Sequence, residues 1–363
     1  MTRLGALNLL AAATCVGLAM LVGVPPSSRR VLAPSASAAA APASRLVEED
    51  GRVGLRDAGG FFVPLADYRR ILSASTVGDG LLLALAEPSR VVAFTEYGAT
   101  RSPNAWRYAG KPTFAGIADV EAAVAFEPDL VLTNGFGAPE RLARLREAGL
   151  TVFDLGEMRG ISSLLANIEA VSLLLARPED GTRLARRFVA RMHALAGAVP
   201  SDERPAGIYL AVYGDSLLGG TTGTSFHDVL AAAGVRDAAA GRWTDWPRYT
   251  PEALLGLDPE LIVTQTGMTA TICAFPGLDR LRACGPGGRM VEVDGALLGD
   301  PGLAMLDAAE TVFEGVHPRP RRTPDHHTHA CAATTSTASR ADSHSSVPAP
   351  SASPVMPPSR RPR

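Results

Sequence analysis

The sequence predicts an α/β protein with two similar lobes, each with a parallel sheet, joined by a long helix and enclosing a ligand cleft between them. Short apolar runs alternate with longer amphipathic stretches, a long helical pattern occupies the middle of the chain, and an internal repeat flanks that pattern. With 363 residues, 46% of them hydrophobic, the chain is long enough for about two domain-sized units.

The apolar runs predict strands that are buried on both faces, because they are nearly continuous in Val, Ile and Leu. These predicted strands are residues 91–95, 130–133, 152–155, 208–212, 261–264 and 290–293. Helical spacing is found between them, at residues 120–126, 138–148 and 226–233. The alternation of the two patterns predicts layered α/β structure.

A long helical segment at residues 161–198 divides the chain into a first lobe, residues 44–160, and a second lobe, residues 199–318. Leu164, Ile168 and Leu175 keep helical spacing in its first part, and Phe188 and Met192 in its second. The run 177–180 interrupts the pattern, and its proline can occupy the first turn of a second helix.

An internal repeat relates the two lobes. Glu121 matches Glu252 and Pro128 matches Pro259, and both pairs are separated by the same number of residues, 252 − 121 = 259 − 128 = 131. In each copy a short helix leads through an acidic-proline turn into a buried strand and a polar loop that contains glycine. Two lobes built alike would enclose a cleft, and the loops after the strands would line it.

The repeat resembles the class III periplasmic binding proteins, the receptors of ABC importers for iron-siderophores, haem and cobalamin. The start, Leu46-Val-Glu-Glu-Asp-Gly-Arg-Val53, and the closing stretch from Asp300 to Pro318 are also similar to this family. One departure is Gly78-Asp79 in the predicted first helix, where the family often has Thr-Glu.

The resemblance implies two α/β lobes bridged by a long helix, with little hinge motion. It also implies a monomeric receptor that binds a metal chelate and delivers it to an ABC permease dimer with its ATPase. No enzymatic activity, cofactor or metal site of the protein's own is expected. The sequence leaves open whether the chelate is a ferric siderophore, haem or cobalamin.

Ligand contacts are implied for aromatic and polar residues in the loops that face the cleft. Aromatic faces suit flat apolar ligands, and arginines suit anionic edges. The alternative is that these aromatic residues pack onto their own lobe, although the cluster from Trp246 to Tyr249 would make a poor core. The expected ligand-binding residues are Tyr97, Trp106, Arg107, Tyr108, Phe114, Asn134, Tyr213, Trp246, Arg248 and Tyr249.

Two glutamates are expected to dock the permease. The resemblance implies that Glu121 and Glu252, at the same position of the two repeats, pair with arginines on the two permease subunits. The alternative is that each glutamate only stabilises the start of its own helix.

Two other classes of site find less support. Ser225, His227 and Asp228 fall within one helical turn, where neighbouring residues do not face one another, so Thr224 or Ser225 as an N-cap explains them better than a hydrolase triad. An exported chelate-modifying enzyme on the same scaffold is the alternative function. The folded part offers too few histidines for a directly coordinated ion, and the net charge of −2 gives no reason to expect a nucleic acid partner.

The two ends of the chain indicate export and a disordered tail. Residues 1–43 read as a signal peptide and linker, with an apolar run from Leu4 to Val24 and a cleavage site near Ala36; the alternative is an uncleaved membrane anchor. The expected location is therefore periplasmic. Residues 319–363 are too polar to fold, and the cluster from His326 to Cys331 reads as part of a solvated tail rather than a metal site.

Cys273 and Cys284 are expected to form a disulfide, because an exported protein folds in an oxidising compartment. Ten residues lie between them. Two buried free thiols are the alternative.

Overall fold

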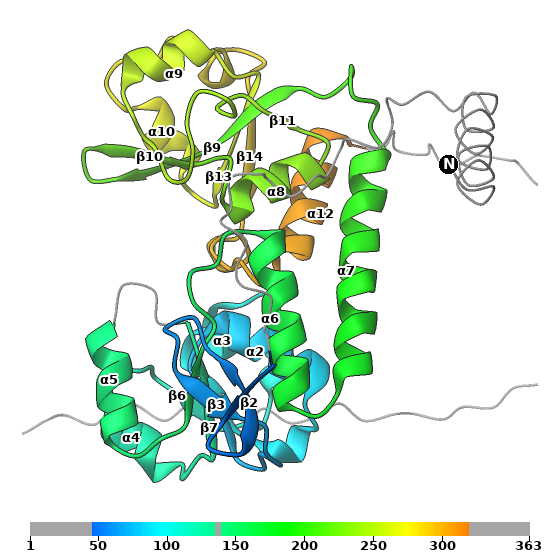
Figure 1. Ribbon diagram of the computed structural model, residues 1–363. Coiled ribbons are helices and arrows are strands. Elements are labelled where there is room, and N and C mark those ends of the chain that lie inside the picture. Colours follow the sequence, from blue (N-terminus) through cyan, green and yellow to red (C-terminus); the bar gives the residue numbers. More distant parts are fainter. Residues whose placement is uncertain (1–45, 135–138, 319–363) are drawn as a thin grey trace, which may run out of the picture. The chain divides into compact units, whose positions relative to one another are not determined.

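The first lobe is organised around a five-stranded sheet in which all neighbouring strands are parallel. The computed structural model describes residues 46–134 and 139–318. The strand order is β6-β5-β4-β7-β8, with β4 (Ile71–Ser73), β5 (Val91–Thr95), β6 (Thr113–Phe114), β7 (Leu130–Thr133) and β8 (Val152–Asp154). Figure 1 labels two of these strands, β6 and β7. The associated helices are α2 (Thr76–Leu85), α3 (Glu96–Arg101), α4 (Val120–Ala125) and α5 (Pro139–Glu147), with 3₁₀ turns η1 (Pro88–Arg90) and η2 (Ala105–Tyr108).

A small antiparallel sheet at the start of this lobe precedes the five-stranded sheet in the chain and was not predicted. It consists of β1 (Leu46–Glu49), β2 (Arg52–Arg56) and β3 (Phe62–Pro64) in sequence order. Its strands are short and largely exposed, so they lack the continuous apolar character that reveals a buried strand.

The second lobe contains a mixed sheet, which corrects the prediction of a purely parallel one. The main path is β12-β10-β9-β13-β14, and β11 (Arg236–Asp237) pairs with β9. The two strands β9 (Ala206–Tyr213) and β10 (Ser216–Gly220) form an antiparallel hairpin, and β12 (Arg248–Tyr249) is antiparallel to β10. The hairpin turn is Gly214-Asp215, and Gly214 has a φ of +56°, which a two-residue hairpin loop of this kind requires.

The remaining strands of the second lobe are parallel. They are β13 (Leu261–Gln265) and β14 (Arg289–Val293), and β13 is parallel to both β9 and β14. Strand β13 is buried, whereas β14 is buried only at Val291 and Val293. The helices of this lobe are α8 (Ser225–Ala232), α9 (Pro251–Leu257), α10 (Thr269–Cys273), α11 (Gly295–Leu298) and α12 (Met305–Val316), with the 3₁₀ turn η3 (Arg282–Cys284).

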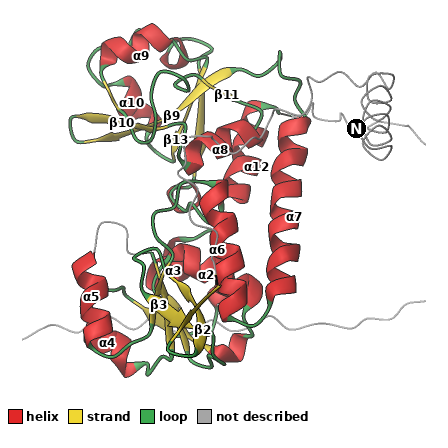
Figure 2. Ribbon diagram, in the orientation of Figure 1, coloured by secondary structure: helices red, strands yellow, loops and turns green. Residues whose placement is uncertain are grey.

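Two helices, α6 (Ile161–Leu174) and α7 (Pro178–Gly197), form the bridge (Figure 2). Pro178 begins the second helix, which confirms the interruption predicted at residues 177–180; the single long helix implied by the family resemblance is therefore two helices. They pack against each other, and α7 also contacts α8 and α12. Buried apolar residues of α6 and α7 join one core cluster with residues of both lobes, among them Leu164, Ile168 and Met192. This shared core fixes the bridge to both lobes.

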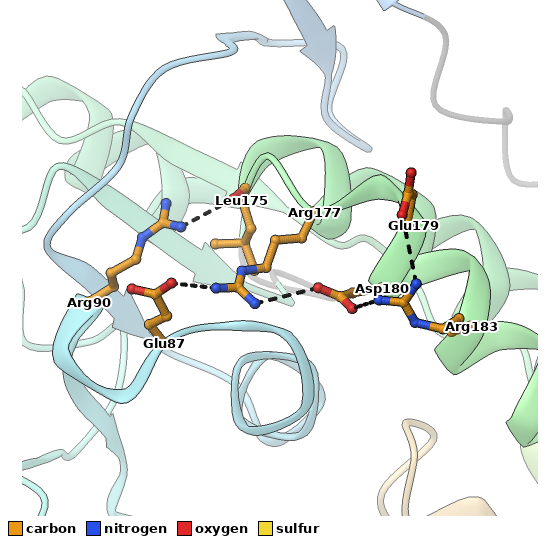
Figure 3. A network of polar contacts seen from close by, with 7 residues as sticks. All are labelled: Glu87, Arg90, Leu175, Arg177, Glu179, Asp180 and Arg183. Carbon is orange, nitrogen blue, oxygen red and sulfur yellow. Dashed lines mark hydrogen bonds and ion pairs between the residues drawn. The ribbon is translucent and has the colours of Figure 1, made fainter.

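The turn between α6 and α7 is tied to the first lobe by arginines (Figure 3). Buried Arg90 donates from Nε to the carbonyl of Tyr68 (2.7 Å) and from Nη1 to the carbonyl of Leu175 (3.1 Å). Arg177 pairs with Glu87 and with Asp180. Because Arg90 donates to the carbonyl of Leu175, the C-cap residue of α6, it stabilises the C-terminal end of this helix, where the turn begins.

The structure confirms the internal repeat in detail. Each short helix is capped in the same way: Ala122 N–H donates to Asp119 Oδ1 (2.9 Å), and Ala253 N–H donates to Thr250 Oγ1 (3.2 Å). The equivalent residues Glu127 and Asp258 both adopt a left-handed φ, of +46° and +40°. Two further features match, since Ala123 and Leu254 are fully buried and so are Thr133 and Thr264 at the strand ends.

The predicted disulfide is present in the structure. Cys273 and Cys284 are bonded, with their Cα atoms 5.5 Å apart. They join the end of α10 to η3, next to the buried residues Ile272 and Ala283.

Removing this disulfide is expected to destabilise the second lobe. Replacing both cysteines by serine should lower the free energy of unfolding by about 3 kcal/mol, because the unfolded chain gains the freedom of an open loop. Urea denaturation of oxidised wild type and of the double variant measures the difference. Equal midpoints, or two free thiols in protein taken from the cell envelope, would contradict this expectation.

Several predictions fall outside the described residues. These are the signal sequence and linker, the tail with its histidines, and the glycine-containing loop after Asn134. Within residues 46–134 and 139–318, no helix combines the length and the apolar character that a membrane crossing needs.

Candidate functional site

A cavity of about 380 Å³ lies between the two lobes. Its volume is in the range of sites that bind small molecules. Loops of both lobes and the segment that leads into α12 contribute to its wall. The described residues that line it are Ser75, Thr76, Val77, Asn134, Glu157, Met158, Ser225, Phe226, Trp246, Gly299 and Pro301.

The first-lobe side of the cavity is built at the carboxyl ends of three neighbouring parallel strands. Ser75 follows β4, Asn134 follows β7 and Glu157 follows β8, and these strands are adjacent in the sheet. Parallel strands bring the loops after them to one edge, which is where ligands bind in α/β proteins. Ser75 also caps α2, since its Oγ accepts from the N–H of Gly78 (3.0 Å).

The second-lobe side is formed by the start of α8 and the loop that precedes β12. Phe226 stacks on the buried Tyr209 with ring centroids 3.8 Å apart, so its position is fixed by the core of the lobe. Trp246 is 42% exposed. An aromatic ring with an exposed face on a cavity wall suits a flat, partly apolar ligand.

Arg159 connects the two lobes beside the cavity. Its Nε donates to Glu157 Oε2 (2.8 Å) and its Nη1 donates to Asp245 in the second lobe. Its guanidinium carbon lies 5.4 Å from the centroid of the Trp246 ring. The hydrogen bonds to Glu157 raise the pKa of Arg159, so the side chain stays charged.

A second contact between the lobes lies next to Arg159. The N–H of Ile161, at the start of α6, donates to Asp228 Oδ2 on α8 (2.7 Å). The intervening Gly160 has a φ of +90°, and a Cβ at this position would lie 2.1 Å from the Asp228 carboxylate. Because only glycine fits here, the start of α6 is held close to α8.

Carboxyl groups gather where α2 meets the segment before α12. Burial raises the pKa of Asp79 to about 6, although hydrogen bonds from Ser73 and Thr95 oppose the shift. Burial, helped by the charges of Asp79 and Asp307, raises the pKa of Asp300 to about 6, although a hydrogen bond from the N–H of Gly302 opposes the shift. Two flanking residues of Asp300, Gly299 and Pro301, line the cavity.

These raised pKa values make stability depend on pH. Folded Asp300 holds a proton up to about pH 6, whereas an unfolded aspartate releases it near pH 4. Its contribution to stability is therefore complete below about pH 4 and is lost as the pH rises through about 6.

The substitution Asp300→Asn is expected to remove this loss of stability at rising pH. The amide oxygen can still accept from the N–H of Gly302 (2.8 Å in the wild type), and no charge has to be buried. The variant should be about 2 kcal/mol more stable than wild type at pH 8, and the difference should shrink toward pH 4. Denaturation curves from pH 4 to 8 test this, with the exposed Asp202→Asn as control; parallel pH profiles for Asp300→Asn and wild type would contradict it.

Of the ten expected ligand-binding residues, Asn134 and Trp246 line the cavity. Five others are exposed and are not among the described lining residues: Tyr97, Trp106, Arg107, Tyr213 and Arg248. Tyr213 accepts a hydrogen bond from Gln265 at 3.4 Å and is 53% exposed, so it lies at the carboxyl edge of the second sheet.

Three of the expected contacts are corrected to core residues. Phe114 is 1% exposed and packs edge-on against Phe126. Tyr108 packs edge-on against Phe94 and its hydroxyl bonds to Asp79. Tyr249 is buried with Trp243 against it. In each case the ring turns toward its own lobe, which is the alternative that the sequence left open.

Two of the residues that could suggest a hydrolase triad, His227 and Asp228, each interact with a different partner. His227 Nδ1 lies 2.8 Å from Asp237 Oδ2, so His227 is a half-buried residue paired with Asp237. Asp228 accepts from Ile161, as described above. Thr224 occupies the N-cap position of α8, but its hydroxyl donates to the carbonyl of Thr221 and does not cap the helix.

Sequence reasoning missed the loop after β8, which supplies Glu157, Met158 and Arg159. The signal was present, because the rule that loops after buried strands line the cleft applies to residues 155–160 as well. This loop has no aromatic residue, whereas most of the expected ligand-binding residues are aromatic.

A match to a known protein family identifies the class of protein that has this cavity. The model of the family described as periplasmic binding protein matches residues 71–311, which is more than half of the chain. The chain belongs to this family.

Two curated relatives of this periplasmic binding protein are similar in sequence. An uncharacterised ABC transporter substrate-binding lipoprotein, YvrC of Bacillus subtilis, is 24% identical over 55% of the chain and 65% of its own length. A cobalamin-binding protein of Halobacterium salinarum is 25% identical over 55% of the chain and 54% of its own length. The match thus spans between about half and two thirds of these relatives.

Solved structures share the fold. The periplasmic haem-binding protein HutB of Vibrio cholerae superposes with a TM-score of 0.59 over 69% of this chain and 99% of that protein, at 20% sequence identity. At this identity the match establishes the two-lobed α/β fold alone.

Proposed function

We propose that this periplasmic binding protein is the extracytoplasmic receptor of an ABC importer and that it binds a metal chelate in the cavity between its lobes. The observation that carries the proposal is the cavity itself. Strand ends of one lobe and a helix start of the other converge on it, and an aromatic face, that of Trp246, is exposed on its wall.

The chemistry of the wall supports a binding role. It combines apolar surface from Val77, Met158 and Phe226 with hydroxyl and amide groups from Ser75 and Asn134. Such a mixture suits a ligand with a flat apolar ring system and polar substituents, as in a corrin, a porphyrin or a siderophore. The Halobacterium relative binds cobalamin and HutB binds haem, which agrees with this class of ligand.

The partners follow from the same proposal. A receptor of this kind acts outside the cytoplasm, delivers its ligand to a permease dimer driven by an ATPase, and functions as a monomer. The metal is cargo within the chelate, and the protein itself needs no cofactor.

Uptake in cells tests the function. Cells that lack the chain should fail to accumulate one class of chelate, labelled cyanocobalamin, haem or a ferric siderophore, and wild-type protein should restore accumulation. The chelate recovered from purified protein should be chemically unchanged. Normal uptake of every chelate without the protein would contradict the receptor, and a modified chelate would favour an enzyme on the same scaffold.

A further inference from the structure

The wall of the inter-lobe cavity has a negative charge. Glu157 is the only ionisable side chain among the described residues that line it. The four residues that follow the lining residue Asn134 are Gly, Phe, Gly and Ala, so the sequence adds no charge there. The net charge of the site therefore also depends on the ionisable groups next to the lining residues.

Arg159, the cation beside Glu157, is already paired. Arg159 donates to both Glu157 and Asp245, so this group of three side chains has two negative charges and one positive charge. Its guanidinium also lies over the ring of Trp246. An anionic ligand that used Arg159 would have to displace one carboxylate and leave it without its partner, which is unfavourable.

Two further carboxyl groups, those of Asp79 and Asp300, are close in sequence to other lining residues. Asp300 is placed between the lining residues Gly299 and Pro301, and Asp79 interacts with it electrostatically. Both have pKa values of about 6, so both are mostly ionised above pH 7. The exposed Arg107 and Arg248, which the sequence suggested for anionic edges, are not among the lining residues.

We propose that the cavity selects metal chelates that present a neutral or cationic surface, and that Glu157 is the residue that sets this preference. The inference rests on the proposed function, because it concerns the ligand of that site. Anionic groups on a ligand would face a wall where Glu157, Arg159 and Asp245 together carry one net negative charge, whereas amide or ammonium groups could donate hydrogen bonds to Glu157. A single unfavourable charge at such a partly solvated site corresponds to roughly a threefold to thirtyfold loss of affinity.

Pairs of chelates that differ only in charge test the preference. Suitable pairs are cyanocobalamin and its monocarboxylic acid, haemin dimethyl ester and haemin, and ferrioxamine B and its N-acetyl derivative. For the pair that binds, the more positive or less negative member should bind roughly threefold to thirtyfold more tightly to wild type at pH 7.5 and low salt. Added salt should reduce this ratio, because exposed charges are screened.

Two variants test whether Glu157 causes this charge preference. Glu157→Gln keeps the size of the side chain and removes its charge, so the ratio within the pair should fall toward one, chiefly because the more negative chelate binds more tightly. Glu203→Gln, an exposed glutamate of the second lobe, is the matched control and should keep the wild-type ratio. Melting temperatures verify that both variants are folded.

The results that would overturn the charge preference, the role of Glu157 and the proposed function differ from one another. If wild type prefers the more negative chelate and Arg159→Gln removes that preference, Arg159 is an anion contact and the proposal is wrong. An unchanged ratio in Glu157→Gln would also overturn the role of Glu157. If none of the chelates binds to wild type, the proposed function itself fails.

Discussion

Replacing Glu121 and Glu252 together by alanine is expected to abolish uptake of the chelate while its affinity for the receptor hardly changes. Both side chains are exposed at the same position of α4 and α9, one on each lobe. The resemblance to importer receptors implies that such a pair docks on arginines of the two permease subunits. Loss of both contacts should therefore stop delivery without touching the cavity.

The structure also bears on the alternative role of these glutamates. Asp119 and Thr250 already cap the two helices through their side chains. The pKa of Glu252 is lowered by its own backbone N–H and by the Thr250 hydroxyl, so this glutamate also interacts favourably with the helix start. If that were its whole role, the double variant would be slightly less stable and would still transport.

A matched control separates the two roles. Glu140 and Glu179 are exposed glutamates at the second position of α5 and α7, each after a proline. The double variant Glu140→Ala, Glu179→Ala removes two helix-start charges elsewhere and should transport normally. Uptake at the wild-type rate by Glu121→Ala, Glu252→Ala would remove the docking assignment.

The second large effect is expected for Trp246→Ala. A tryptophan at the centre of a binding surface commonly accounts for more than 2 kcal/mol, so chelate affinity should fall by about thirtyfold or more. The side chain is partly exposed, and its removal should change the melting temperature little. Titration calorimetry with the chelate that wild type binds measures the change.

Trp106→Ala is the control for this experiment. Trp106 is 74% exposed, was also expected to contact ligand, and is not among the lining residues. Its replacement should leave affinity unchanged, and Trp246→Phe should retain part of the binding because it keeps an aromatic face. Equal affinity of wild type and Trp246→Ala would exclude Trp246 from the site.

Much of the fold could be predicted from the sequence, for a physical reason. The six predicted strands differ from β5, β7, β8, β9, β13 and β14 by at most two residues at either end. The first five are largely buried and therefore need continuous apolar runs, whereas β14 is buried only at Val291 and Val293. The repeat was visible because the two lobes place the same chemistry at helix starts and strand ends. The strands β1, β2, β3, β10 and β12 were missed because they are short or partly exposed and leave no such run.

The site was less predictable, because position along the chain does not fix the direction of a side chain. Asn134 and Phe114 both lie at strand ends of the same sheet, yet Asn134 reaches the cavity and Phe114 is in the core. The role of Arg159 depends on Asp245, which is 86 residues away in sequence and comes from the other lobe. Pairings of this kind are produced by tertiary structure and leave no local pattern.

The most direct test of the account is an equilibrium titration of wild-type protein with cyanocobalamin, haem and ferric siderophores, followed by mass spectrometry of the released ligand. The account predicts that one class of chelate binds with a stoichiometry of one per chain, that Trp246→Ala weakens this binding, and that the chelate is released unchanged. Failure of all the chelates to bind, or release of a chemically altered chelate, would contradict it.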